Sequence, residues 1–222
     1  MEQTECLIPT YGVLTEQQIA LINKNSQIIK HKHGEIIFKQ DRPVSHIIFI
    51  KTGLIKLYKQ IDEKSEIILD IMHSDQFIGL TSLFYENLHP YGASSLEEGE
   101  LIYVNSNVFR DILTENGKYS VQIMTVLSSR VFFLTNKMIA LTKKQVPGRI
   151  AEMLLHFSKN IYKNNVIILP LSRQEIADLV QSTKETVSRT LKEFKNDRII
   201  ELDERKVTLI SLDLLEILNK IG

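Results

Sequence analysis

The pattern of hydrophobic and polar positions divides the chain into three segments. From about residue 10 to residue 110 the apolar runs are short, as in "SEIILDIM", "QFIGL" and "GELIYV", and Gly or Pro interrupts them. Many short strands at close spacing are typical of a β-barrel or roll rather than of a parallel sheet crossed by helices. The stretch "TEQQIALINKN" before them predicts a helix that is capped by Thr15.

Residues from about 117 to 145 predict one long helix. Its apolar positions alternate in steps of three and four, which is the spacing of an a/d seam. The seam consists of Met124, Leu127, Val131, Leu134, Met138 and Leu141. Such a stripe could simply pack on the roll, but it is narrow and polar residues flank it, so we interpret it as the seam of a parallel homodimer. Val126, Phe132 and Phe133 lie off the seam and could cover the roll instead.

The last third of the chain predicts a helix-turn-helix. "TKKQVPG" breaks the long helix, and Pro147 begins another over "GRIAEMLLHFSKNI". Two S-x-x-E patterns follow, Ser172 with Glu175 and Ser182 with Glu185, and each is a capping-box signature. The two predicted helix starts lie only ten residues apart, so the helices must be short and joined by a tight turn.

The two short helices have opposite inner and outer faces. Apolar positions form the inner faces: Ile176, Ala177 and Val180 in the first helix, and Val187, Leu191 and Phe194 in the second. Five polar side chains of the second helix project away from this core: Lys184, Glu185, Ser188, Arg189 and Lys192. This is the geometry of a recognition helix that enters the major groove of DNA.

Glu185 is unexpected on a surface that faces a polyanion. A carboxylate can accept a hydrogen bond from the N4 amino group of cytosine, and Arg189 can bind guanine in bidentate fashion. Alternatively, Glu185 only closes the capping box with Ser182. One side-chain rotamer cannot fully serve both roles.

The residues after the second helix predict a wing. "DRIIELDERKVTLIS" reads as two short strands around "DERK", and "SLDLLEILNKI" reads as a closing helix. Arg205 and Lys206 at the tip could touch DNA or could be solvated turn residues.

Composition and charge narrow the function classes. The chain has 222 residues, 43% of them hydrophobic, and a formal net charge of zero. Its basic residues are in slight excess after residue 142, with 14 Lys and Arg against 11 Asp and Glu, which favours nucleic-acid binding there. Cys6 is the single cysteine, so the chain cannot form an internal disulfide or a four-cysteine iron–sulfur cluster. Short apolar runs and the lack of a signal-like N-terminus predict a cytoplasmic protein with no membrane partner.

Three stretches resemble the Crp–Fnr family of transcription regulators. "RQEIADLVQSTKETVSRTLK" is similar to the DNA-binding signature, "VPGRIAEMLL" to the start of the DNA-binding domain, and "GEIIFKQDRPVSHIIFIKTGLIKLY" to the cyclic-nucleotide-binding-like roll. The resemblance implies an α+β fold with an N-terminal β-roll (cyclic-nucleotide-binding-like jelly roll) in residues 1–115, a long dimerisation helix in 116–145, and a C-terminal winged helix-turn-helix in 146–222.

The same resemblance implies a non-enzymatic homodimer that binds double-stranded DNA at a palindromic site, under the control of a ligand or of redox state. RNA polymerase is an expected partner if the protein is an activator, and no catalytic residue is expected. The resemblance implies DNA contacts from Ser172, Arg173, Gln174, Thr183, Lys184, Glu185, Thr186, Ser188, Arg189 and Lys192. Glu185, Ser188 and Arg189 resemble the Fnr-type readers of TTGA-like half-sites. Gln181 departs from the family, which usually has Gly there, so we expect a left-handed residue with some strain.

The roll departs from the family's cyclic-AMP binders. Their phosphate cassette has Gly-Glu before an Arg-Ser or Arg-Thr pair, whereas Leu80 stands at the Glu position and Pro90 and Tyr91 near the Arg-Ser position. No Lys or Arg occurs between Ser65 and Phe109, and a buried cyclic phosphate needs a cation. We therefore predict no cofactor, with neither cyclic AMP nor an iron–sulfur cluster, and an effector that the sequence does not name.

Histidines provide the alternative function. His31 and His33 in "HKHGE" would share one strand face and are similar to part of the metal motif of cupin enzymes, although a matching second half is missing. A metal-dependent cupin-type enzyme is thus the competing hypothesis, and a heme bound by His73 or His89 is a further one. Each of these histidines also fits a solvated strand or turn position, and no metal ligand is predicted.

Overall fold

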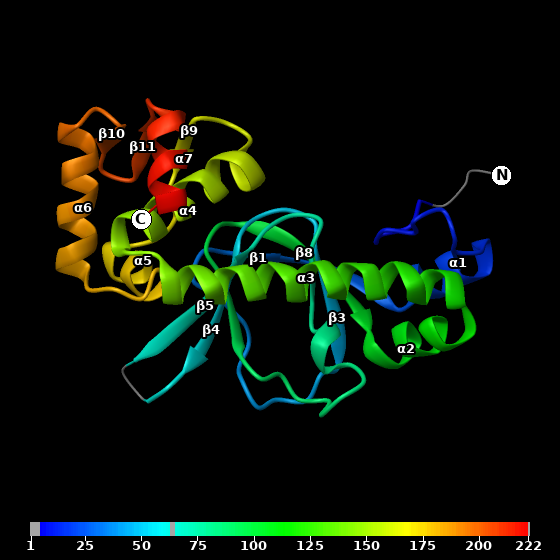
Figure 1. The fold of residues 1–222 in the computed structure, drawn as a ribbon. Coiled ribbons are helices and arrows are strands. Elements are labelled where there is room, and N and C mark those ends of the chain that lie inside the picture. Colours follow the sequence, from blue (N-terminus) through cyan, green and yellow to red (C-terminus); the bar gives the residue numbers. More distant parts are fainter. Residues whose placement is uncertain (1–4, 63–64, 222) are drawn as a thin grey trace. The chain divides into compact units, whose positions relative to one another are not determined.

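The structure is a computed structural model that describes residues 5–62 and 65–221. Its contacts divide the chain into two compact units, one ending at Phe132 and the other beginning at Phe133. Figure 1 shows the first unit as strands with helices at the N-terminal side, and the second as a mainly helical body with a small sheet.

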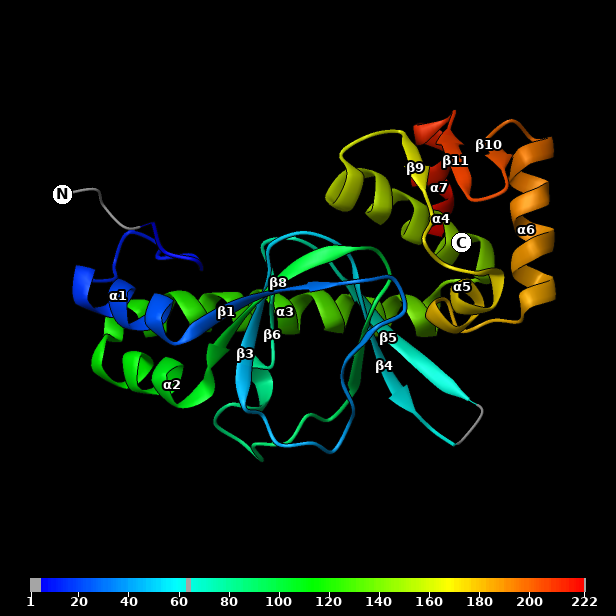
Figure 2. The ribbon, with the colours of Figure 1, turned by 180° about the vertical axis from the view of Figure 1, so that it is seen from behind.

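The first unit contains two four-stranded antiparallel sheets (Figures 1 and 2). One sheet has the order β1 (Ser26–His31), β8 (Gly99–Asn105), β3 (His46–Ile50), β6 (Phe77–Ile78). The other has the order β2 (Ile36–Phe38), β7 (Gly92–Ser95), β4 (Ile55–Gln60), β5 (Glu66–Met72). This arrangement confirms the predicted β-roll.

The core of the roll comes from the inward faces of these strands. Phe49, Ile102 and Val104 join one buried cluster, which α1 (Glu16–Lys24) and α2 (Ser106–Glu115) extend. The hydroxyl of Thr15 accepts the backbone N–H of Gln18, and the Gln18 side chain accepts that of Thr15, so the predicted cap of α1 is confirmed.

The long helix α3 runs from Gly117 to Lys143, close to the predicted limits. Its first turns bury Tyr119 and Ile123 against the core of the roll, and Val126 packs beside them. Leu127, which was predicted to lie in the dimer seam, packs against the same core. Phe132 does not cover the roll as expected, because 70% of it is exposed. Phe133 lies in the second unit, where its ring is 5.6 Å from that of His156.

The second unit is a winged helix-turn-helix, as predicted. Its elements are α4 (Val146–His156), the π-helical turn η2 (Phe157–Tyr162), β9 (Val166–Ile168), α5 (Arg173–Leu179), α6 (Lys184–Asn196), β10 (Ile200–Asp203), β11 (Lys206–Leu209) and α7 (Leu212–Ile221). The sheet order is β10-β11-β9, so the wing hairpin carries a third strand that the sequence analysis missed. Figure 2 shows α6 on the outer side of this unit, next to α5 and β10.

The two histidines of "HKHGE" do not share a strand face. His31 ends β1, and its Nε2 lies 2.9 Å from the Tyr103 hydroxyl. His33 follows the strand, and its Nδ1 donates to the Leu96 carbonyl at 2.6 Å. Among residues 5–62 and 65–221, no three His, Cys, Asp or Glu side chains are grouped so that they could hold a metal ion. In the same residues no helix is long and apolar enough to cross a bilayer.

Candidate DNA-binding interface

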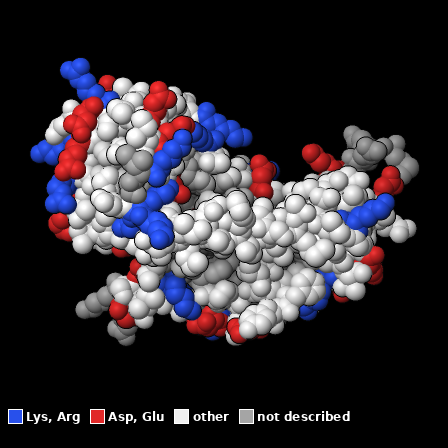
Figure 3. Space-filling model, in the orientation of Figure 1, with Lys and Arg blue, Asp and Glu red and all other residues white. Residues whose placement is uncertain are grey.

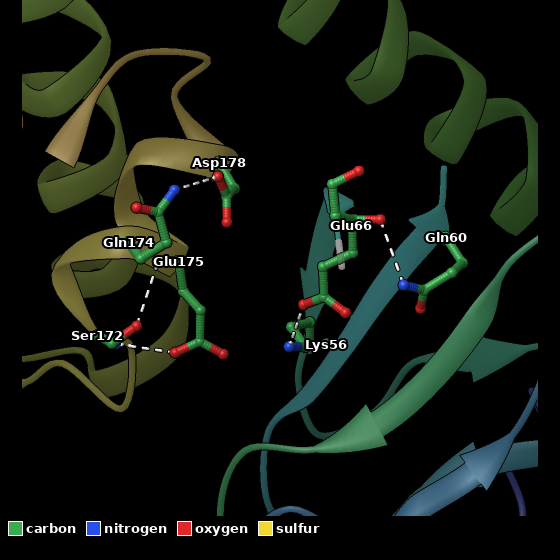
Figure 4. Close-up of polar contacts among 8 residues, drawn as sticks. Lys56, Gln60, Glu66, Ser172, Gln174, Glu175 and Asp178 are labelled. Atoms are coloured by element: carbon green, nitrogen blue, oxygen red, sulfur yellow. Dashed lines mark hydrogen bonds and ion pairs between the residues drawn. The ribbon is translucent and has the colours of Figure 1, made fainter. Parts of the chain in front are cut away.

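The first helix of the motif, α5, begins with the predicted capping box. The Ser172 hydroxyl accepts the Glu175 N–H at 3.2 Å, and the Glu175 carboxylate accepts the Ser172 N–H at 2.9 Å (Figure 4). These two bonds satisfy donors that the first turn of a helix otherwise leaves free. Gln174 is exposed and donates to the Asp178 carboxylate at 2.8 Å.

The turn between the helices is left-handed at Gln181, where φ is 49°. This confirms the conformation expected at the position where the family usually has Gly. The Ser182 N–H then bonds the Ala177 carbonyl at 2.9 Å and closes the turn. A left-handed conformation costs a residue with a Cβ about 1 kcal/mol, so other contacts must hold Gln181 in place.

The second helix, α6, begins one residue later than predicted. Its N-cap is Thr183, whose hydroxyl accepts the Thr186 N–H at 3.2 Å. The expected capping box of Ser182 with Glu185 is therefore wrong, because the partner in a capping box stands three positions after the cap, and Glu185 stands only two positions after Thr183. Glu185 lies in the first turn of α6 with an exposed side chain.

The two faces of α6 are as predicted. Val187, Leu191 and Phe194 are buried in the unit's core. The outward face exposes Lys184, Glu185, Ser188, Arg189 and Lys192. Arg189 lies 3.9 Å from Glu193 in an exposed i,i+4 pair, which is worth little in water and leaves the guanidinium available to a base.

Two further cations brace the wing. The Arg173 guanidinium donates to the Glu204 carbonyl at 3.3 Å, and the Lys195 ammonium donates to the Leu202 carbonyl at 2.9 Å. Burial lowers the pKa of Arg173 below its usual value. Arg173, which the resemblance assigned to DNA contact, therefore lies half-buried against the wing, and Lys195 is a wing contact that the sequence analysis did not find.

Charges of both signs mark the recognition face. Figure 3 shows Lys and Arg side chains along the edge of the second unit where α6 lies, with Asp and Glu among them. Cations attract the phosphate backbone at any sequence, and carboxylates oppose it. A face with charges of both signs is thus expected to have a lower affinity for DNA of any sequence and a stronger discrimination between bases.

The roll contains an ion pair at the place where the sequence lacks a cation. Arg130 of α3 pairs with Asp70 of β5, and the Asp70 side chain is only 6% exposed. Asp70 is buried with Ile68 and Met72, while Leu69 between them is exposed, so the alternation of β5 directs the carboxylate inward. Sequence reasoning missed this pair because its cation lies 60 residues away along the chain.

His89 is a second buried polar side chain of the roll, and its ring lies near Gly79. Gly79 is left-handed, with φ at 94°. His89 stacks on Phe38 with ring centroids 3.7 Å apart, and its Nδ1 is buried with no hydrogen-bond partner. Burial lowers the pKa of His89 to about 4, so this ring is neutral at neutral pH.

Both units match known domain families. Residues 28–116 match the family described as cyclic nucleotide-binding domain, and residues 148–218 match the Crp-like helix-turn-helix domain. The roll and the motif described above are thus each typical of a known family.

Curated relatives match most of the chain. The CRP-like cAMP-activated global transcriptional regulator of Mycobacterium tuberculosis is 25% identical over 195 residues, which cover 86% of this chain and 87% of the relative. The transcriptional activator protein FnrA of Stutzerimonas stutzeri is 25% identical over 183 residues, covering 81% and 75%.

Solved structures share the fold. FixK2 from Bradyrhizobium japonicum superposes with a TM-score of 0.81 at 20% identity, covering 87% of this chain and 97% of that one. The order of roll, long helix and winged helix-turn-helix, the two domain matches and these relatives together show that the chain belongs to the Crp/Fnr family of DNA-binding transcriptional regulators.

Proposed function

We propose that the protein binds as a homodimer to a palindromic DNA site with TTGA-like half-sites. The observation that carries this proposal is the outward face of α6, where Glu185, Ser188 and Arg189 are exposed together. Because Thr183 caps the helix, the Glu185 side chain takes no part in the cap. Its carboxylate can therefore accept from a cytosine N4 group while Arg189 binds a guanine.

The dimer is supported by the exposed apolar seam of α3. Met124, Val131, Leu134 and Met138 are between 41% and 63% exposed. Figure 3 shows a largely uncharged strip where α3 runs. Exposed apolar stripes of this length at a/d spacing are stabilised by pairing with a second helix. Two parallel copies would present two recognition helices related by a two-fold axis, which is the symmetry of a palindrome.

We infer that an effector other than cyclic AMP controls the protein. Arg130 is a cation within the roll, but Asp70 already pairs with it. A cyclic phosphate would have to compete with that buried carboxylate for Arg130, and breaking a buried ion pair is costly. The Mycobacterium tuberculosis relative is described as cAMP-activated, so cyclic AMP is the first ligand to test.

Selection from random DNA tests the half-site. The wild-type protein should enrich two TTGA-like half-sites related by a two-fold axis and about one helical turn apart. Enrichment of TGTGA-like half-sites, or of single unpaired ones, would contradict the proposal.

Calorimetry tests the effector. We expect cyclic AMP and cyclic GMP to bind no more tightly than about millimolar, because no Lys or Arg occurs between Ser65 and Phe109 and because Asp70 competes with a phosphate for Arg130. As a matched variant, Asp70→Asn leaves Arg130 unneutralised and should bind cyclic AMP more tightly than the wild type. Micromolar binding to the wild-type protein would contradict the inference.

A further inference from the structure

Arg149 occupies an unusual position near the start of α4. Its Nη1 donates to two carbonyls, that of Leu141 at 3.1 Å and that of Lys144 at 3.0 Å. Its Nη2 donates to the Gln181 carbonyl at 3.2 Å. Within the described residues no Asp or Glu pairs with this guanidinium, and its Nε is buried without a hydrogen-bond partner. The charge is thus directed entirely at backbone carbonyls.

Two of these carbonyls belong to the C-terminal end of α3 and the residue after it. The last carbonyls of a helix have no partners within the helix and carry partial negative charge. Arg149 satisfies the Leu141 carbonyl at that end. A planar fork can bond such carbonyls and a third group at once, which a lysine ammonium does less well.

The third carbonyl belongs to the strained residue of the helix-turn-helix. Gln181 is left-handed although it has a side chain. The bond from Arg149 favours the one backbone conformation in which the Gln181 carbonyl points at α4. The next residues, Ser182 and Thr183, close the turn and cap α6, so the geometry at Gln181 determines where the recognition helix starts.

We propose that Arg149 is a positioning residue for DNA recognition. It holds Gln181 in the left-handed conformation and thereby fixes the start of α6 relative to the C-terminal end of α3. This inference rests on the reading of DNA by α6 that is given above as the proposed function. It adds a residue that touches no base and that acts through the backbone of the turn.

A double-mutant cycle tests the proposal, because glycine adopts the left-handed conformation without strain. The variants are Arg149→Met, Gln181→Gly and the pair together, each measured for affinity to a fluorescent duplex with two TTGA-like half-sites. We expect Arg149→Met to weaken binding about tenfold and Gln181→Gly to change it by less than about twofold. The double variant should recover to within about threefold of the wild type, because the turn no longer needs the arginine.

Hydrogen exchange gives a readout that is independent of DNA. The amides of Ser182 and Thr186 should exchange faster in Arg149→Met than in the wild type, and Gln181→Gly should restore their protection. Arg173→Met is a matched control, since Arg173 also donates to a backbone carbonyl in this unit. Its loss of affinity should not be rescued by Gln181→Gly.

Two results would overturn the inference. One is a double variant as weak as Arg149→Met, which would mean that the arginine serves only packing. The other is unchanged amide protection in Arg149→Met. If that variant does not fold, Arg149→Lys takes its place in the same cycle. If the wild type does not bind the duplex while the amide cycle shows rescue, the proposed half-site fails and the positioning role of Arg149 stands.

Discussion

At the scale of single residues, the sequence offered two alternative roles for Glu185, which were closing the capping box of the second helix and reading a base. Thr183 provides the cap of α6, and Glu185 is left exposed. We therefore predict that Glu185→Ala leaves the free energy of unfolding nearly unchanged but removes base preference at the pair that it reads. Thermal unfolding and selection from random DNA measure the two effects.

Thr183→Ala is the matched control for that experiment. It should cost about 1 kcal/mol of stability, as the loss of a helix cap does, and should leave the selected sequence the same. A Glu185→Ala protein that selects the wild-type motif would show that Glu185 reads no base.

Because His89 is buried, we predict that the free energy of unfolding decreases at acidic pH. The unfolded histidine titrates near pH ~6.5, whereas burial lowers its pKa to about 4 in the fold. Between these two pKa values, the unfolded chain binds more protons than the folded one. The contribution of neutral His89 to the free energy of unfolding is therefore fully present above pH ~6.5 and is lost as the pH falls toward 4. Urea unfolding should show a loss of roughly 2–3 kcal/mol from this residue.

The comparison for His89 is His89→Phe, which keeps a ring to stack on Phe38. Other groups titrate in both proteins, so the prediction concerns the difference between them. The variant should lose less stability than the wild type between pH 7 and pH 4.5. If the two proteins lost the same stability over this pH range, groups other than His89 would be responsible for the acid sensitivity.

At the scale of elements, we propose that α6 combines base contacts and phosphate contacts on one face. We predict that Arg189→Ala costs about 1–3 kcal/mol of binding and relaxes the preference at one G·C pair. Lys192→Ala should weaken all sequences alike and should reduce the salt slope by about one unit. Fluorescence titrations at several salt concentrations, on the selected site and on a site with that pair changed, distinguish the two effects. If Arg189→Ala and Lys192→Ala weakened binding to the selected site and to the changed site by the same factor, the assignment of Arg189 to a base and Lys192 to a phosphate would be wrong.

Local pattern predicted most of these elements, and its failures have physical causes. The roll, the long helix and the wing follow from the spacing of apolar runs, and Ser172 marks α5 because its capping box is contained in four residues. The start of α6 was misplaced by one residue because Ser182 and Thr183 are both good caps, and only the left-handed turn at Gln181 decides between them.

Contacts between distant residues could not be predicted in the same way. The Asp70–Arg130 pair joins β5 to α3 and depends on how this helix packs on the roll, which has no local signature. The bonds from Arg149 to Leu141 and Gln181 depend on how α4 packs in the second unit. The base-reading candidates were found because they share one helix face.

At the scale of the whole molecule, self-association should control DNA binding. We predict that Leu134→Lys with Met138→Lys, both exposed in the single chain, gives a monomer, because four like charges would meet in the buried seam of a dimer. Sedimentation velocity measures the change in mass, and the monomer should bind the palindrome far more weakly than the wild type. Phe132→Lys is the control, since this exposed residue lies off the seam. A dimeric double variant would place the interface elsewhere.

If the apolar seam of α3 joins two copies as proposed, it also affects how the regulator responds to its own abundance. Where most copies are single chains, the amount of dimer rises with the square of the total concentration, so about twice as much protein gives about four times as much dimer. Promoters with a palindrome would then be switched steeply by modest changes in synthesis or degradation. The strength of the proposed seam would therefore set the expression level at which the target genes respond.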